Sequence, residues 1–146
     1  MTPAEEFGEE LPLLHLLPLT HRLFSLADSK KQYGLTKSQT LILVALFYRG
    51  TVCMSQIAAY LNSSKEQATR AVAGMVELGL IERYERPDNR THVYVRLTDN
   101  GRDYVVKCCT ELSQQVNEKL EAALTAEERC ELRESLRTVI RLLDQI

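Results

Sequence analysis

Residues 55–97 read SQIAAYLNSSKEQATRAVAGMVELGLIERYERPDNRTHVYVRL, and this stretch decides the fold. Two short segments with helically spaced apolar residues are followed by two segments rich in β-branched and aromatic residues. A charged turn that contains a proline, residues 87–90, separates the two β-rich segments. The order helix, turn, helix, strand, turn, strand predicts a winged helix-turn-helix, a module that binds mainly duplex DNA.

The second predicted helix of this stretch has one apolar and one polar face. Ser63 and Glu66 have the spacing of a capping box, so we expect Ser63 to begin the helix. The residues expected to point inward are Ala68, Ala71, Val72, Met75 and Leu78. The residues expected to reach base edges or phosphates in a major groove are Ser64, Lys65, Gln67, Thr69 and Arg70. An ordinary solvated helix has the same residue types, so the prediction depends on the hairpin that follows.

Residues 80–86 and 91–97 are predicted to form that hairpin. The second run alternates, with Val93, Val95 and Leu97 on one face and His92, Tyr94 and Arg96 on the other. An arginine at a solvated tip suits a narrow minor groove, whose negative potential attracts guanidinium groups. The candidate DNA contacts of the wing are Arg86, Asp88, Asn89 and Arg90. Asp88 either pairs with Arg90 or begins the turn.

Several of these motifs together resemble the signature of the MarR-type transcriptional regulators. The matching segments are Leu35-Thr36-x-x-Gln39, Ser55-Gln56-Ile57-Ala58, Thr69-Arg70, Gly79-Leu80-Ile81-Glu82-Arg83, Arg86-Pro87-Asp88-Asn89-Arg90-Thr91 and Leu97-Thr98-x-x-Gly101. By layout, the resemblance extends over nearly the whole chain. It is specific as a combination, whereas a helix-turn-helix pattern alone would be weak.

The resemblance implies a homodimer with a recognition helix that begins near Ser64 and a wing arginine at Arg90. It also implies a repressor whose affinity for a pseudopalindromic operator falls when a small molecule or an oxidant acts. A small aromatic or amphipathic effector would bind where the first, second and long helices meet the reading module, and the candidate polar residues there are His15, Arg22 and Tyr104. The chain departs from the family at residues 66–68, where relatives usually carry small hydroxylated residues, and this leaves the base preference open.

The flanking segments predict a single, mainly α (α+β) domain over residues 1–146. Residues 11–34 are rich in leucine and predict a helix that ends near Tyr33, with Pro18 in its interior as a kink or restart. A long helix from about Asp99 to Leu124 and a last helix with an apolar stripe follow the wing. We expect residues 11–34 and 99–146 to form a dimerisation region and residues 35–98 to read DNA.

Capping signals and a short β-branched run complete the predicted reading module. Capping boxes begin helices at Thr36 and Thr125, and Thr98 caps the long helix. The apolar helix after Thr36 is expected to be the buried centre of the domain. Residues 51–53 could add a third strand to the wing, and Ser55 is expected to cap the helix over residues 56–61.

The net charge of −2 does not favour a purely electrostatic nucleic-acid binder, but the charge is unevenly distributed. Residues 1–10 hold four acids and no base, and residues 111–146 hold eight acids and five bases. Four arginines lie in or beside the hairpin: Arg83, Arg86, Arg90 and Arg96. A locally basic face on an acidic body favours one docking orientation. Because no segment is a signal peptide or long enough to span a bilayer, we expect no membrane partner and a cytoplasmic protein.

The sequence gives no support for an enzyme, a metal site or a cofactor. No histidine lies beside a cysteine, and no pair of histidines shares a helix face with an acid. The four cysteines lack C-x-x-C spacing, so the adjacent Cys108 and Cys109 are only candidates for a redox switch. Two alternatives to a repressor with a small-molecule effector remain: a thiol-based redox-sensing regulator, and a winged-helix module that binds proteins.

Overall fold

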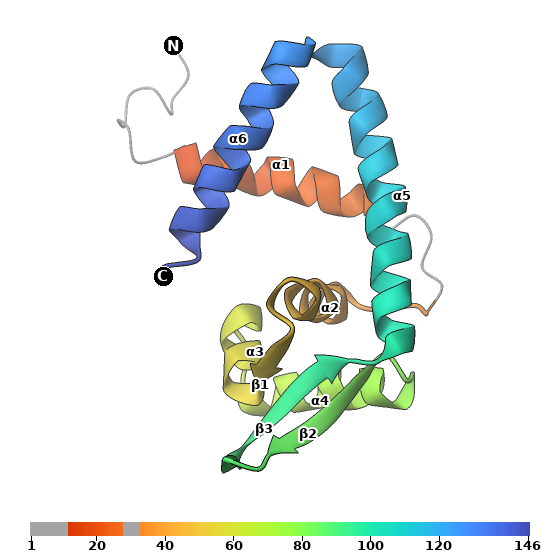
Figure 1. Ribbon diagram of the computed structural model, residues 1–146, viewed down its shortest axis with the longest axis vertical. Helices are drawn as coiled ribbons and strands as arrows, with labels where there is room; N and C mark the ends of the chain where they lie inside the picture. Colours follow the sequence, from red (N-terminus) through yellow and green to blue (C-terminus); the bar gives the residue numbers. More distant parts are fainter. Residues whose placement is uncertain (1–11, 28–32) are drawn as a thin grey trace. The chain divides into compact units, whose positions relative to one another are not determined.

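The structure is a computed structural model that describes residues 12–27 and 33–146. Within these ranges it has six helices and one three-stranded sheet, which confirms the mainly α winged helix-turn-helix (Figure 1). The helices are α1 (Pro12–Ala27), α2 (Lys37–Arg49), α3 (Met54–Leu61), α4 (Lys65–Glu77), α5 (Asp99–Ala123) and α6 (Ala126–Leu143). The strands are β1 (Thr51–Cys53), β2 (Ile81–Arg86) and β3 (Asn89–Leu97).

The chain divides into two units. One unit is residues 28–109 and contains α2, α3, α4, the sheet and the first part of α5. The other unit is formed by residues 1–27 and 110–146 and contains α1, the rest of α5 and α6. The winged helix-turn-helix therefore lies within the first unit.

The sheet has the order β1-β3-β2, and both strand pairs are antiparallel. Val52 pairs with Val95, which confirms that residues 51–53 add a third strand to the wing. On the other side of β3, Tyr84 pairs with Tyr94. The register of this second pair is irregular between Glu85 and Arg86, next to the hairpin tip.

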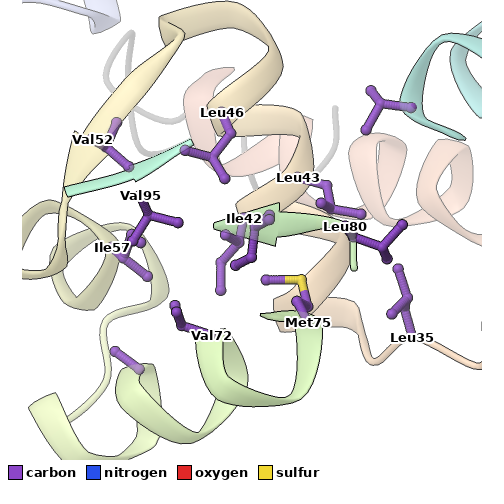
Figure 2. Packing of buried hydrophobic residues seen from close by; sticks show 13 residues of the cluster. Leu35, Ile42, Leu43, Leu46, Val52, Ile57, Val72, Met75, Leu80 and Val95 are labelled. Atoms are coloured by element: carbon purple, nitrogen blue, oxygen red, sulfur yellow. The ribbon is translucent and has the colours of Figure 1, made fainter. Parts of the chain in front are cut away.

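The core of the first unit lies between α2, α3, α4 and the sheet (Figure 2). Ile42, Leu43 and Leu46 of α2 are buried, as expected for the central helix, although Leu41 is exposed. The predicted inward stripe of α4 is confirmed at the fully buried residues Ala68, Val72 and Met75. The prediction was wrong at Leu78, which is 40% exposed. The chain turns there through Gly79, whose φ is +72°, and buries Leu80 instead.

The helix starts agree with the predicted caps at α2, α5 and α6 and differ at α3 and α4. Thr36 and Thr125 form capping boxes, and Thr98 accepts a hydrogen bond from the Gly101 amide at 3.0 Å. The predicted Ser63 cap was wrong: Ser64 is the N-cap of α4, and Gln67 is its reciprocal partner. Two overlapping motifs, S-x-x-E and S-x-x-Q, made both starts possible.

The prediction for α3 was also wrong by two residues at its start. Ser55 does not cap this helix, because α3 begins at Met54 and Cys53 is the N-cap residue. The carboxamide oxygen of Gln56 accepts a hydrogen bond from the Cys53 amide at 2.9 Å. The cysteine therefore lies at the junction of β1 and α3, directly before the first helix of the helix-turn-helix.

The first helix continues through Pro18. α1 is one helix from Pro12 to Ala27, so Pro18 does not restart it. The predicted end of this helix near Tyr33 depends on residues 28–32, which lie outside the described residues. Gly34 has a φ of +61°, a conformation that suits the predicted glycine.

Apolar side chains on α1 and α6 remain exposed within this single chain. Leu17 is 63% exposed on α1, and Ile140 is 59% exposed on α6. All the buried apolar residues of the described part lie between Leu35 and Val105. The helices α1 and α6 therefore leave several large apolar side chains exposed to solvent.

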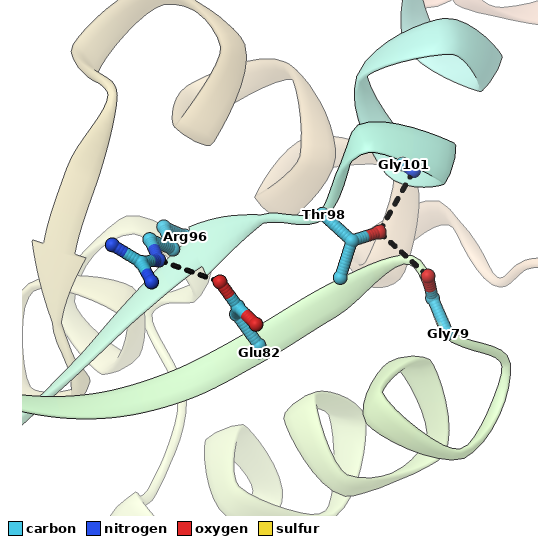
Figure 3. Close-up of polar contacts among 5 residues, drawn as sticks. All are labelled: Gly79, Glu82, Arg96, Thr98 and Gly101. Atoms are coloured by element: carbon cyan, nitrogen blue, oxygen red, sulfur yellow. Dashed lines mark hydrogen bonds and ion pairs between the residues drawn. The ribbon is translucent and has the colours of Figure 1, made fainter.

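Thr98 joins the wing to α5 through three hydrogen bonds. Its hydroxyl donates to the Gly79 carbonyl at 2.6 Å and accepts from the Gly101 amide (Figure 3). Its backbone amide donates to the Leu80 carbonyl at 3.1 Å. Gly101 is buried, and a Cβ atom placed there would overlap that same carbonyl oxygen. Thr98 and Gly101 thus connect the end of β3, the turn before β2 and the first turn of α5.

Candidate nucleic-acid interface

The first two turns of α4 present polar side chains to solvent. Lys65, Thr69 and Arg70 are exposed, opposite the buried stripe of the helix, as the spacing predicts. The Thr69 hydroxyl donates a hydrogen bond to the Lys65 carbonyl at 2.7 Å, which fixes its orientation on the helix. A helix with small and hydrogen-bonding groups on this face can enter a major groove.

Ser64 and Gln67 are exposed at the start of α4, but both side chains take part in the cap. The Ser64 hydroxyl accepts from the Gln67 amide at 3.2 Å, and the Gln67 carboxamide oxygen accepts from the Ser64 amide at 3.3 Å. Between them, Glu66 is held as a carboxylate. Hydrogen bonds to its own backbone amide and then to Ser64 lower its pKa, with a smaller contribution from Lys65. This negative charge suits a helix N-terminus but would oppose a phosphate nearby.

The hairpin tip is shorter than predicted. The connecting residues are Pro87 and Asp88, whereas Asn89 and Arg90 already belong to β3, so the four-residue turn was wrong. The Asn89 side chain accepts from the Thr91 hydroxyl at 2.6 Å and lies 3.2 Å from Nδ1 of His92. These contacts make Asn89 part of a polar cluster that stiffens the tip.

Arg90 is exposed beside this tip. In the part of the chain from residue 33 onward, no ion pair joins Arg90 to Asp88, so of the two expectations for Asp88 the structure favours a place in the turn. The guanidinium of Arg90 is therefore available to a ligand outside the chain. Its position next to a tight turn suits a narrow groove.

A cavity of about 490 Å³ lies between α4 and the wing. Lys65 and Thr69 line it from α4, and Arg83, Thr91 and His92 line it from the hairpin. Arg83 and His92 were not among the contact residues predicted from the sequence. The signal for Arg83 was its spacing: it lies two residues after the buried Ile81 and so on the same face of β2. Basic and hydroxyl groups thus continue from the helix to the wing.

Arg86 lies on the opposite face of the hairpin. Its guanidinium carbon is 4.4 Å from the centre of the Tyr94 ring, and it forms a hydrogen bond with the Tyr84 side chain. That hydrogen bond is the main reason why the pKa of Arg86 is raised and the pKa of Tyr84 is lowered. Arg86 is therefore the one predicted wing contact whose side chain is already held by aromatic neighbours.

The candidate effector residues lie in different units. His15 and Arg22 are exposed on α1. Tyr104 is half-buried on α5, where its ring packs edge-on against Tyr33 with centroids 4.9 Å apart.

The cysteines differ in their surroundings. Cys108 and Cys109 are half-buried on α5, and burial, with a smaller contribution from Cys108, raises the pKa of Cys109. Partial burial also opposes ionisation of Cys53, but hydrogen bonds from Ser55 and from nearby backbone amides outweigh it and lower the Cys53 pKa. Cys53, which also lines the cavity, has the more reactive environment, and the sequence carried no signal for it.

No cluster of three or more histidine, cysteine, aspartate or glutamate side chains within residues 12–27 and 33–146 could hold a metal ion. None of the helices described is both long enough and apolar enough to cross a membrane.

Comparison with known proteins agrees with this geometry. Residues 35–93 match the model of the MarR family. An uncharacterised HTH-type transcriptional regulator of Bacillus subtilis, YdgJ, is 27% identical over 96 residues, which are 66% of this chain and 58% of that protein. The match thus spans little more than half of that relative.

Solved structures share the fold over most of the chain. A mutant MepR from a multidrug-resistant clinical isolate of S. aureus has a TM-score of 0.76 at 21% identity, covering 92% of this chain and 99% of that one. A mutant MarR of E. coli complexed with operator DNA has a TM-score of 0.58 at 21% identity, covering 90% and 99%. NadR in complex with 4-hydroxyphenylacetate has a TM-score of 0.71 at 17% identity, covering 90% and 93%.

A winged helix-turn-helix with a polar recognition face thus coincides with the segment that the family model matches. The chain is therefore similar to the MarR family over residues 35–93, and the solved structures share its fold.

Proposed function

We propose that this chain is a homodimeric repressor that binds a pseudopalindromic operator and leaves it when a small molecule binds. The observation that carries the proposal is a set of basic and hydroxyl side chains on α4 and the wing. Lys65, Thr69 and Arg70 are exposed on α4, Arg83 lines the same cavity as Lys65 and Thr69, and Arg90 is exposed beside the hairpin tip. Its helix would enter a major groove, and Arg90 would enter the adjacent minor groove.

A dimer would bring two such surfaces to one face of the duplex. Recognition helices in successive major grooves must lie about 34 Å apart, a spacing that a fixed pair of subunits can supply. The exposed leucines and isoleucines of α1 and α6 support this association, because burying them would remove apolar surface from water. A repressor then acts by occupying a site that the transcription machinery needs.

Release by an effector is supported by the solved structure of NadR with a phenolic acid. A ligand can lower DNA affinity only if it binds more tightly to a dimer whose helices miss the operator spacing. The candidate polar contacts remain His15, Arg22 and Tyr104. We use 4-hydroxyphenylacetate as the probe. We expect it to weaken operator binding by the factor by which it prefers the dimer whose recognition helices miss the operator spacing.

The first experiment selects duplexes from a random library with the purified full chain and measures binding by fluorescence anisotropy. We expect an inverted repeat, two chains per duplex, and affinity that falls steeply with salt. A winged-helix module that binds only proteins would retain no DNA in a salt-dependent way. Selection of an asymmetric site by one chain would contradict the dimeric repressor.

The second experiment tests the dimer itself. Ile140→Glu places a charge on the exposed apolar face of α6, and we expect it to shift the particle from twice the mass of one chain to a monomer in light scattering. Leu41→Glu is the matched control, because Leu41 is an exposed leucine of α2, outside α1 and α6. If the wild-type chain is a stable monomer at micromolar concentration, the dimeric repressor is excluded.

A further inference from the structure

The outer face of the wing carries an alternating row of arginines and tyrosines. Arg96 lies 4.5 Å from the centre of the Tyr84 ring, and Arg86 lies 4.4 Å from the centre of the Tyr94 ring. The two rings are 5.9 Å apart. Glu82 ends the row with a 2.6 Å ion pair to Arg96 (Figure 3). These five side chains, here named the outer row, come from neighbouring positions of β2 and β3.

Arg86 is the member of the outer row closest to the hairpin tip. It is the last residue of β2, directly after the register irregularity, so regular strand pairing does not by itself fix its direction. The ring of Tyr94 does constrain it, because the guanidinium carbon lies 4.4 Å from the ring centre. The neighbouring Tyr84 side chain also interacts with the guanidinium, and this interaction is the largest cause that lowers the Tyr84 pKa.

The other arginine at the tip is held differently. Arg90 takes part in no ring contact or ion pair with any residue of the described chain, although it lies only four residues from Arg86. A free arginine loses rotamer freedom when it binds a phosphate, whereas one already stacked on a ring has lost much of it beforehand. The two tip arginines should therefore contribute differently to DNA binding.

We propose that Tyr94, assisted by Tyr84, is a positioning residue that holds Arg86 in the orientation in which it meets a DNA phosphate. This proposal rests on the proposed function and extends its DNA contacts to the outer face of the wing, opposite the cavity. The ring contact leaves the guanidinium edge free to donate hydrogen bonds while its face is stacked. Preordering of this kind raises affinity without adding a phosphate contact.

The proposal makes a prediction that a merely structural role would not. Loss of the Tyr94 ring should weaken DNA binding and leave the slope of log affinity against log salt unchanged, because the phosphate contact is still made. Loss of the Arg86 charge should reduce that slope by about 1. Affinity and salt dependence thus separate positioning from direct contact.

The test measures the dissociation constant and salt slope of the full chain on the tightest duplex from library selection. We expect Tyr94→Leu to bind about three- to tenfold more weakly and Tyr94→Phe, which keeps the ring, to bind within about twofold of the wild type. In an Arg86→Gln background, Tyr94→Leu should weaken binding no further. The control is Tyr60→Leu on α3, which removes a similar ring contact with Arg49 of α2 and should change DNA binding little.

Two results would overturn the positioning role: unchanged affinity of Tyr94→Leu, or an equal loss with and without Arg86. A thermal melt of each variant shows whether the wing itself has been destabilised. If Tyr94→Leu loses the same DNA affinity in the wild-type and Arg86→Gln backgrounds and also lowers the melting temperature, the outer row contributes to stability alone. If the wild-type chain binds no duplex in a salt-dependent way, the proposed function fails. If it binds and only the coupling between Tyr94 and Arg86 is absent, the positioning role fails alone.

Discussion

Ser64 and Gln67 each accept a hydrogen bond from the backbone amide of the other at the first turn of α4, at 3.2 and 3.3 Å. Both are also candidate DNA contacts. A glutamine that reads adenine uses its oxygen and its amino group together. The cap turns the Gln67 side chain back toward the Ser64 amide, whereas the bidentate contact requires the side chain to point toward a base edge. Its role at the operator and its role in the helix compete.

Substitutions at these two positions can separate the roles. Ser64→Ala should lower the free energy of unfolding by about 1 kcal/mol, because an orphan amide of α4 loses its partner. Gln67→Glu keeps an acceptor at the same position and adds a negative charge at the helix N-terminus, so stability should be retained. The same charge should repel phosphates and weaken DNA binding. Chemical denaturation and anisotropy, at one fixed protein concentration, check both effects; equal stability loss in the two variants would contradict the capping role.

Arg90 and Arg70 are predicted to contribute to DNA binding in different ways. Arg90→Ala should weaken binding to selected and random duplexes alike and reduce the salt slope by about 1, because its contact is electrostatic. Arg70→Ala should lose about 1–3 kcal/mol on the selected duplex and discriminate less between duplexes, because a base contact is lost.

The control for both arginines is Arg133→Ala, an exposed arginine on α6 that lies outside the winged helix. It should leave affinity and salt slope unchanged. An Arg90→Ala variant with wild-type affinity and slope would show that the wing assignment is wrong. If Arg70→Ala lowers affinity equally on all duplexes, its contact is to phosphate and the base preference comes from elsewhere on α4.

Gly101 has no room for a side chain. Gly101→Ala would drive a methyl group into the Leu80 carbonyl oxygen, a backbone atom that also accepts the Thr98 amide. We expect a loss of about 1–3 kcal/mol or more in unfolding free energy, because the connection between the wing and α5 must open. Gly74→Ala is the control, since its methyl group meets only the flexible end of Gln39 at 3.1 Å. That variant should be neutral or slightly stabilised; equal effects of the two would contradict the close packing.

Periodicity predicted the winged helix well because it reports burial. The stripe over Ala68, Val72 and Met75 and the inward position of Val95 depend on which side chains face one core, and that is written in the spacing of apolar residues. The wing's third strand followed from β-branched residues at 51–53 for the same reason.

The details of the interface needed three-dimensional contacts. Two overlapping capping boxes offered starts at Ser63 and Ser64, and only the folded helix selects the second. The cation contacts of Arg86 depend on Tyr84 and Tyr94 lying opposite one another in register, a pairing that the short, irregular turn decides. Arg83 was not predicted because a charged residue is not expected on the inward face of a strand. The cavity beside α4 gives its side chain an open position there.

The cysteine environments give the last prediction. Thiolate, not thiol, reacts with iodoacetamide, so a lowered pKa gives Cys53 a larger reactive fraction at neutral pH, and the raised pKa of Cys109 delays its reaction until the pH is higher. Peptide mass spectrometry after brief labelling between about pH 6.5 and 8.5 should therefore find Cys53 modified first. Ser55→Ala removes the hydroxyl 2.9 Å from the sulfur and should slow labelling of Cys53 while leaving Cys109 unchanged. If Cys109 is labelled first at neutral pH, the candidate redox site is on α5, as the sequence predicted. If Cys53 is labelled first, any thiol-dependent regulation of this chain acts beside the DNA-binding surface.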